Sequence, residues 1–144
     1  RIEGEGKVAS VRSGMLRTLP EFEAVEKRCA DVFEGLAPEN KTFFYSNLYS
    51  QCSFMTNLSH ALYHFVFAYK NEKNGSVCFE NLELAEKYMI DARHALYMNH
   101  HVVFKTWYDG DAAGVKFNMP QVQKRISDLK ENYRNNRGFS MYYD

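Results

Sequence analysis

Hydrophobic residues recur every three or four positions along most of the chain, a spacing that places them on one face of an α-helix. The pattern is strongest from residue 41 to residue 69, where no Pro or Gly interrupts it. The main stripe consists of Phe44, Leu48, Cys52, Met55, Leu58, Leu62, Phe65 and Tyr69, and a second row of Phe43, Phe54, Ala61 and Phe67 widens it. A helix that is apolar over so much of its surface must be covered on two sides. We therefore expect a buried central helix from residue 38 to about residue 71.

The same central segment carries no formal charge between Lys41 and Lys70, which raises the alternative of a membrane span. Asn, Gln, Ser and His side chains are interleaved through it, however, and it lacks a run of about 18 consecutive apolar residues. The sequence thus predicts a core helix and no membrane span.

Further stripes predict the helices that cover this central helix. One begins at Pro20, a residue favoured in the first helical turn, and ends near Gly35. A second covers residues 80–108 after a turn signal at Asn74-Gly75, and a third opens at Pro120. Long helices joined by a short loop form an antiparallel hairpin. The expected fold is all-α, an antiparallel helical bundle of about four helices built on a hairpin of residues 38–71 and 80–108.

The two ends of the chain lack a helical stripe. Residues 1–19 contain Gly4, Gly6 and Gly14, a poor composition for a helix, so we expect an extended linker or the end of a preceding domain. The bundle domain then covers residues 20–134, and residues 135–144 form a tail. Because the chain starts without Met or a targeting segment, we interpret it as part of a larger protein.

The composition excludes several classes of function. Eighteen basic residues balance 18 acidic ones, so no global field attracts nucleic acid or an anionic membrane surface. The three cysteines have no paired spacing, which predicts neither a zinc site nor a disulfide framework. Cys29 and Cys52 fall on predicted helix faces, where we expect small buried hydrophobic side chains. We expect no cofactor and no nucleic-acid partner.

Histidines give one candidate for metal chemistry. His60 and His64 lie one helical turn apart, a spacing found in metal sites, and His94 lies on the partner helix. A simple hairpin register places His60 opposite Ile90 and His64 opposite Glu86, so His94 falls about one turn or more away. Di-iron bundles also need Glu-x-x-His pairs, which this chain lacks. The prediction is therefore no metal, with a metal-binding bundle kept as an alternative.

The stretch Trp107-Tyr108-Asp109-Gly110-Asp111 is the best candidate for ligand binding. Aromatic faces stack on the C–H groups of a pyranose, and carboxylates accept hydrogen bonds from pairs of hydroxyls. We predict a sugar-facing rim made of Trp107, Tyr108, Asp109 and Asp111. The alternative is that Trp107 covers the core and the acidic side chains are solvated.

Two segments carry a family resemblance over roughly residues 20–133. They read FFYSNLYSQCSFMTNLSHALYHFVFAYKN and LELAEKYMIDARHALYMNHHVVFKTWYDGD. The pattern resembles the helical domains that follow the catalytic domain in large bacterial carbohydrate-active enzymes, in particular the family 115 α-glucuronidases. The matching residues are Phe43, Phe44, Leu48 and Tyr49 in the first segment and Lys105, Trp107, Tyr108 and Asp109 in the second.

The chain also departs from that family. The family has a Met-rich segment containing His after its Trp, whereas Asp111-Ala-Ala-Gly-Val-Lys116 stands here. No catalytic residue is therefore carried over to this chain. The resemblance implies a non-catalytic accessory domain of a larger carbohydrate-processing enzyme, secreted or periplasmic, which packs on the catalytic domain of the same chain and contributes to a sugar-facing rim.

Another class of function remains open. A protein-interaction or oligomerisation bundle would have the same helical pattern but no contact with sugar. A large exposed apolar and aromatic patch would favour it.

Overall fold

The computed structural model describes residues 5–98 and 119–135, and every regular element within these ranges is helical. The elements are α1 (Glu5–Gly35), α2 (Pro38–Phe44), the π-helical turn η1 (Tyr45–Tyr49), α3 (Ser50–Lys70), α4 (Gly75–Tyr97) and α6 (Met119–Arg134). The prediction of an all-α bundle is confirmed. None of the helices in the described ranges is long and apolar enough to cross a bilayer, as the sequence predicted.

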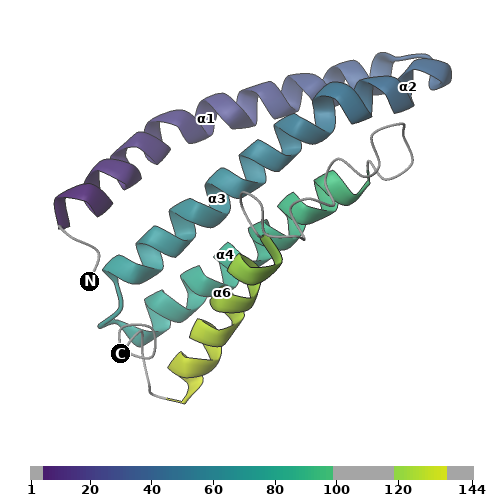
Figure 1. Cartoon of the computed structure of the whole chain (residues 1–144). Coiled ribbons are helices and arrows are strands. Elements are labelled where there is room, and N and C mark those ends of the chain that lie inside the picture. Colours follow the sequence, from purple (N-terminus) through teal and green to yellow (C-terminus); the bar gives the residue numbers. More distant parts are fainter. Residues whose placement is uncertain (1–4, 99–118, 136–144) are drawn as a thin grey trace.

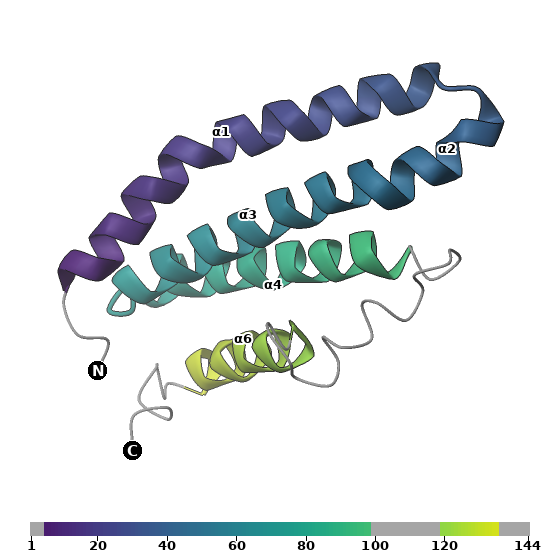
Figure 2. The same cartoon turned by 45° about the horizontal axis from the view of Figure 1, so that its top comes forward.

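The long helices lie side by side in the order α1, α3, α4, α6, and each runs antiparallel to its neighbour (Figures 1 and 2). The α3–α4 hairpin forms the middle of this row, while α1 packs mainly on α3 and α6 mainly on α4. The bundle is therefore open: α3 and α4 each have long neighbours on two sides, and the outer helices each have one.

The core lies between α3 and α4 and extends under α6. It contains Ala61, Ala68, Cys78, Leu82, Ala85, Met89, Leu96, Ile126 and Leu129. The α4 members recur at helical spacing and are almost fully buried, with Leu82 and Ala85 at 0% exposure. The small side chains of Ala61 and Ala68 on α3 let the two helices of the hairpin approach closely, so Leu82 fills space that a larger partner would occupy.

The hairpin turn differs from the sequence prediction in one detail. Helix α4 begins at Gly75, five residues before the predicted start at residue 80. Asn74 is the N-cap residue, and its side chain accepts a hydrogen bond from the backbone N–H of Val77 at 3.5 Å. The cap satisfies a backbone donor of the first turn and so starts the helix directly after the turn. At the other end, residues 99–108 of the predicted helix lie outside the described residues.

The predicted central helix is continuous from Pro38 to Lys70 but contains the wide turn η1. Tyr45 and Tyr49 lie in this turn, and their ring centroids are 6.1 and 5.7 Å from that of Phe33 on α1. Lys41 adds its ammonium group at 4.8 Å from the same ring centroid. This aromatic cluster joins the end of α1 to the start of the central helix.

The prediction that residues 1–19 are extended is wrong for residues 5–19, which form the first half of α1. The predicted domain boundary before Pro20 thus falls inside a helix. Arg12 lies 4.9 Å from the ring centroid of Phe67 on α3, and Leu19 is buried at 7% exposure. These tertiary contacts outweigh the low helix propensity of the glycines.

Pro20 sits inside α1 rather than at its start. A proline there removes one backbone hydrogen bond and crowds the preceding turn. The hydroxyl of Thr18 donates to the carbonyl oxygens of Gly14 at 3.1 Å and Met15 at 3.4 Å, a contact that often bends helices. Both features account for the curvature of α1 that is visible in Figure 1.

Candidate functional site

The predicted sugar-facing rim of Trp107, Tyr108, Asp109 and Asp111 lies outside the described residues. It stays a prediction. The candidates that the structure describes are the histidines, two surface pockets and one exposed apolar face.

His60 and His64 stack on the ring of Tyr88 from α4. The ring centroids of His60 and Tyr88 are 4.5 Å apart, and those of His64 and Tyr88 are 5.5 Å apart. The predicted register paired His60 with Ile90 and His64 with Glu86. Tyr88 lies between these two positions on α4, so the observed pairing agrees with the prediction to within one turn. His94 is exposed on α4 and takes no part in this stack.

Each stacked histidine also makes a polar contact with a neighbouring helix. His60 Nε2 lies 2.8 Å from a carboxylate oxygen of Glu23 on α1. His64 Nδ1 lies 2.9 Å from Oδ1 of Asn81 on α4. Burial lowers the pKa of His64, the Asn81 contact opposes that shift, and the nearby His60 adds to it. Uncharged His64 therefore suits its site at neutral pH.

The histidine cluster does not assemble a metal centre from the described residues. Residues 5–98 and 119–135 contain no group of three or more His, Cys, Asp and Glu side chains that could hold a metal ion. One ring nitrogen of His60 is engaged by Glu23, and one of His64 by Asn81. The arrangement connects α3 to α1 and α4 through polar contacts.

A groove of about 310 Å³ lies beside this cluster, between α1, α3 and α4. Its lining consists of Glu23, Glu26, Lys27, Ala30, Tyr49, Thr56, Asn57, His60 and Tyr88. A nucleophile activated by a base, the arrangement that covalent catalysis needs, is not found among these lining residues. The groove is a polar seam between helices.

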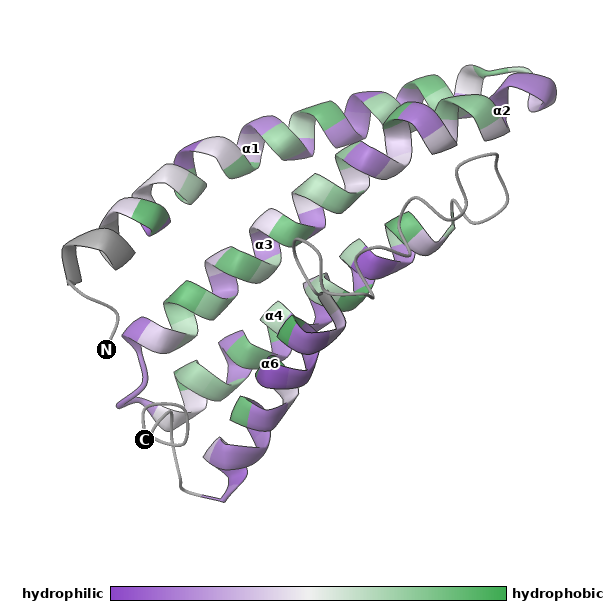
Figure 3. Ribbon diagram, viewed as in Figure 1, coloured by the Kyte–Doolittle hydropathy of each residue, from purple (hydrophilic) through white to green (hydrophobic). Residues whose placement is uncertain are grey.

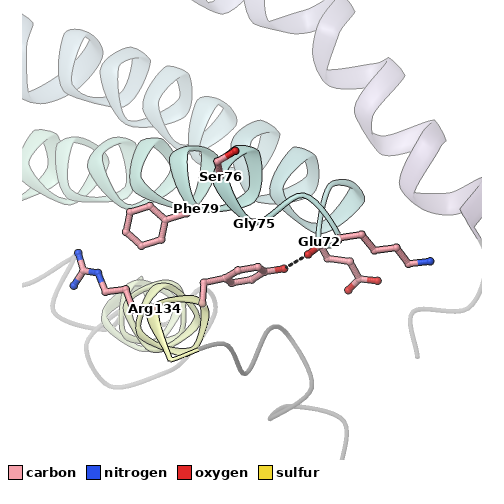
Figure 4. Close-up of a pocket in the computed structure, with 7 residues that line it drawn as sticks. Glu72, Gly75, Ser76, Phe79 and Arg134 are labelled. Carbon is pink, nitrogen blue, oxygen red and sulfur yellow. Dashed lines mark hydrogen bonds between the residues drawn. The ribbon is translucent and has the colours of Figure 1, made fainter.

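A wider pocket of about 780 Å³ lies where the α3–α4 turn meets the end of α6 (Figure 4). The hydroxyl of Tyr133 donates to the backbone carbonyl of Glu72 at 2.8 Å. The guanidinium carbon of Arg134 lies 5.2 Å from the ring centroid of Phe79. These contacts hold α6 to the turn.

The third candidate is a set of exposed apolar side chains on α1 and on the central helix. We define this apolar face as Val25, Val32, Leu48, Met55 and Leu62. Their exposures are 47%, 48%, 47%, 41% and 43% respectively. Figure 3 shows hydrophobic residues along the whole of α3, whereas α6 is mostly hydrophilic. The five side chains belong to two neighbouring helices, and a contiguous exposed apolar patch marks an interaction site.

Helical geometry places the five residues on one side of the α1–α3 pair. Cys29 and Cys52 are in contact, with 3.5 Å between their sulfurs, and this contact sets the register of the two antiparallel helices. Val25 then lies level with Met55, and Val32 level with Leu48. The Glu23–His60 contact lies on the opposite side of the pair, since Glu23 and Val25 are about 200° apart on α1. The pair thus has one polar side and one apolar side.

The sequence pattern assigned Leu48, Met55 and Leu62 to the core stripe together with Leu58 and Phe65, which are partly buried and pack against the core. Buried Ala61 and Ala68 form a second row with the same seven-residue spacing, so the repeat does not distinguish the exposed row from the buried one. Periodicity alone could not decide which row has a neighbouring helix.

Comparison with known proteins adds no relative: no protein-family model, no curated protein and no solved structure matches this chain.

Proposed function

We propose that this chain is a helical protein-interaction module that associates with a second copy of itself through the apolar face. The observation that carries the proposal is the row of Leu48, Met55 and Leu62, each 41–47% exposed on a helix that is otherwise well packed. An apolar stripe that remains in water favours burial against another protein.

The spacing of the row fits pairing with an identical helix. Leu48 and Leu62 lie seven residues before and after Met55. When two copies of the central helix pair antiparallel about a twofold axis at Met55, Leu48 in η1 of one copy meets Leu62 in α3 of the other. A seven-residue repeat is also the spacing at which two packed helices keep their contact row aligned. The row is therefore self-complementary.

Charge also permits association between identical copies. The chain carries 18 basic and 18 acidic residues, so two copies do not repel each other through net charge. No charged side chain belongs to the apolar face itself. Val25 and Val32 extend it onto α1, so the area available for burial is wider than one helix.

Size-exclusion chromatography with light scattering tests the proposal directly. The native chain is expected to have the mass of a dimer at high concentration and to dissociate on dilution. Met55→Glu places a charge at the centre of the face and should raise the dissociation constant at least about 10-fold, since burying an unpaired charge is costly. A native chain that stays monomeric over the whole concentration range would overturn the proposal.

Ile90→Glu provides the matched control. Ile90 is 47% exposed, like the members of the apolar face, but lies on α4 away from it. This variant should keep the mass and dissociation constant of the native chain. Equal loss of dimer in Ile90→Glu and Met55→Glu would contradict an interface on α3.

A further inference from the structure

The thiols of Cys29 on α1 and Cys52 on α3 are in contact and join parts of the chain that are distant in sequence. Their Sγ atoms lie 3.5 Å apart, although 23 positions separate the residues in sequence. A disulfide bond has a length of about 2 Å, so each sulfur needs to move by less than about 1 Å. The third cysteine, Cys78, is fully buried in the α3–α4 core.

The backbones of the two helices also approach closely at this level. Thr56 lies one turn after Cys52, and its hydroxyl reaches the backbone carbonyl oxygen of Phe22 on α1 at 3.3 Å. Phe22 lies two turns before Cys29 on the same side of α1. A short side chain that reaches the main chain of the opposite helix shows that α1 and α3 approach closely one turn from Cys52, as a bridge between them requires.

We propose that Cys29 and Cys52 form an oxidation site that closes to an intramolecular disulfide bond and covalently joins α1 to α3. The oxidant class is a small-molecule disulfide, such as oxidised glutathione. This inference does not depend on the proposed self-association, because both cysteines belong to one copy of the chain.

Exposure determines the order of the two steps. Cys29 is only 5% exposed, whereas Cys52 is partly exposed, so the reagent reaches Cys52 first. The Cys52 thiol loses its proton to solvent, and the thiolate attacks one sulfur of the small disulfide and displaces a thiolate. Cys29 then loses its proton and attacks the Cys52 sulfur, which displaces the second thiolate. Two protein thiols are oxidised and one small disulfide is reduced to two thiols, which take up the two protons.

The second step is expected to limit the rate. Burial, the contact with Cys52 and the nearby charge of Glu26 raise the pKa of Cys29 to about 11. In the mixed disulfide Cys52 no longer carries a thiol, but burial and the charge of Glu26 still raise the pKa of Cys29. Only a small fraction of Cys29 is therefore thiolate at neutral pH, and closure should become faster as the pH is raised. The attack is intramolecular, so the proximity of the two sulfurs offsets part of the rate that is lost to the small thiolate fraction of Cys29.

The test treats the native protein with excess oxidised glutathione, alkylates the remaining thiols and maps the products by peptide mass spectrometry. The expected product is one Cys29–Cys52 bridge, with Cys78 recovered as the alkylated thiol after unfolding. In Cys29→Ser the reaction should stop at glutathione bound to Cys52. A native protein that ends with stable glutathione on Cys52, or with a bridge that includes Cys78, would overturn the proposal.

Two further measurements separate a site built by the fold from chance reactivity. In concentrated urea the fold no longer selects a pair, so bridges to Cys78 should appear beside the Cys29–Cys52 bridge. The bridged native protein should also unfold at a Tm roughly 10 °C above the reduced protein, because the bond closes a loop of intermediate length in the unfolded chain. Cys78→Ser, which leaves both sulfurs in place, should show the same shift between its oxidised and reduced forms, whereas Cys52→Ser should show none.

Discussion

Single residues explain how the polar side of the molecule is organised. His60 and His64 contact α1 and α4 through Glu23 and Asn81, while both rings stack on Tyr88. The sequence predicted the spacing of the two histidines and the approximate register of the hairpin. It could not predict these partners, because a spacing defines a helix face and does not say which side chains meet it. The residues that resemble a metal pattern thus serve as contacts between helices.

The lowered pKa of His64 predicts how stability changes with pH. The unfolded chain binds a proton near the ordinary value of 6.5, whereas folded His64 binds one only at lower pH. The contribution of neutral His64 to stability is therefore complete above about pH 6.5 and is lost as the pH falls towards the folded pKa. His64→Gln should lose part of the acid sensitivity of the native protein between about pH 7 and about pH 5. Urea unfolding at several pH values measures the difference.

His94→Gln is the control for this experiment, because His94 is an exposed histidine on α4. It should keep the pH dependence of the native protein. If His64→Gln showed the same pH dependence as His94→Gln, the shifted His64 pKa would not contribute to stability.

At the scale of elements, local signals predicted most helix boundaries. Pro120 marked the start of α6 to within one residue, and Asn71 lies one residue beyond the end of α3. The missed element is the first half of α1. Its glycines indicated an extended segment, but contacts such as that of Arg12 with Phe67 on α3 stabilise a helix there. Propensity is a weak guide where a long-range contact decides the conformation.

One charged cluster adds to the apolar contacts of Ile126 and Leu129 that hold α6 to α4. Lys130 Nζ lies 2.6 Å from a carboxylate oxygen of Glu86, and the hydroxyl of Ser127 donates to the same carboxylate. Burial alone would raise the pKa of Glu86, but these contacts outweigh it and the pKa is lowered. The Glu86 contribution to stability is thus present above about pH 4.5 and is lost as the pH falls further.

This cluster predicts a measurable coupling between α4 and α6. The side chains of Glu86 and Lys130 are only 19% and 15% exposed, so removal of either leaves a poorly solvated charge. A double-mutant cycle of Glu86→Gln and Lys130→Met should give a coupling free energy of about 1–2 kcal/mol in urea unfolding at neutral pH. Lys124 and Asp128 form an ion pair within α6 at a similar distance of 2.8 Å but with greater exposure. The corresponding cycle for that pair should give only about 0.3–0.5 kcal/mol, and equal values for the two cycles would count against a special role of Glu86.

At the scale of the whole molecule, the open row of helices is what sequence reasoning could not derive. The stripe of the central helix was predicted to be covered on two sides, and α1 and α4 do cover two sides. Of the sides that remain, the one opposite the histidines carries Leu48, Met55 and Leu62 at the surface. Hydrophobic periodicity reports which residues share a face, but burial of that face depends on where the other helices lie. The exposure of Leu48, Met55 and Leu62 therefore follows from the positions of the neighbouring helices and could not be predicted from the sequence.

The side-by-side arrangement of the four long helices predicts which of them open most easily. Helices α3 and α4 share most of the buried core, whereas α1 and α6 each pack mainly on one neighbour. Regions with fewer buried contacts open at lower free energy, so amide hydrogens exchange faster there. In the reduced protein, exchange in the first half of α1 should be at least about 10-fold faster than around Leu82 and Ala85 in α4. Hydrogen-exchange mass spectrometry resolves these regions.

Self-association would also slow hydrogen exchange in α3. Its effect must therefore be distinguished from that of packing within one copy. The Met55→Glu variant provides that separation, since it should be monomeric. Its α4 should remain slower to exchange than its α1, because the α3–α4 core does not involve Met55. Equal exchange rates in α1 and α4 of this variant would mean that the row opens as one cooperative unit. A persistent difference would instead mean that the α3–α4 hairpin is the stable centre, on which α1, α6 and a second copy are assembled.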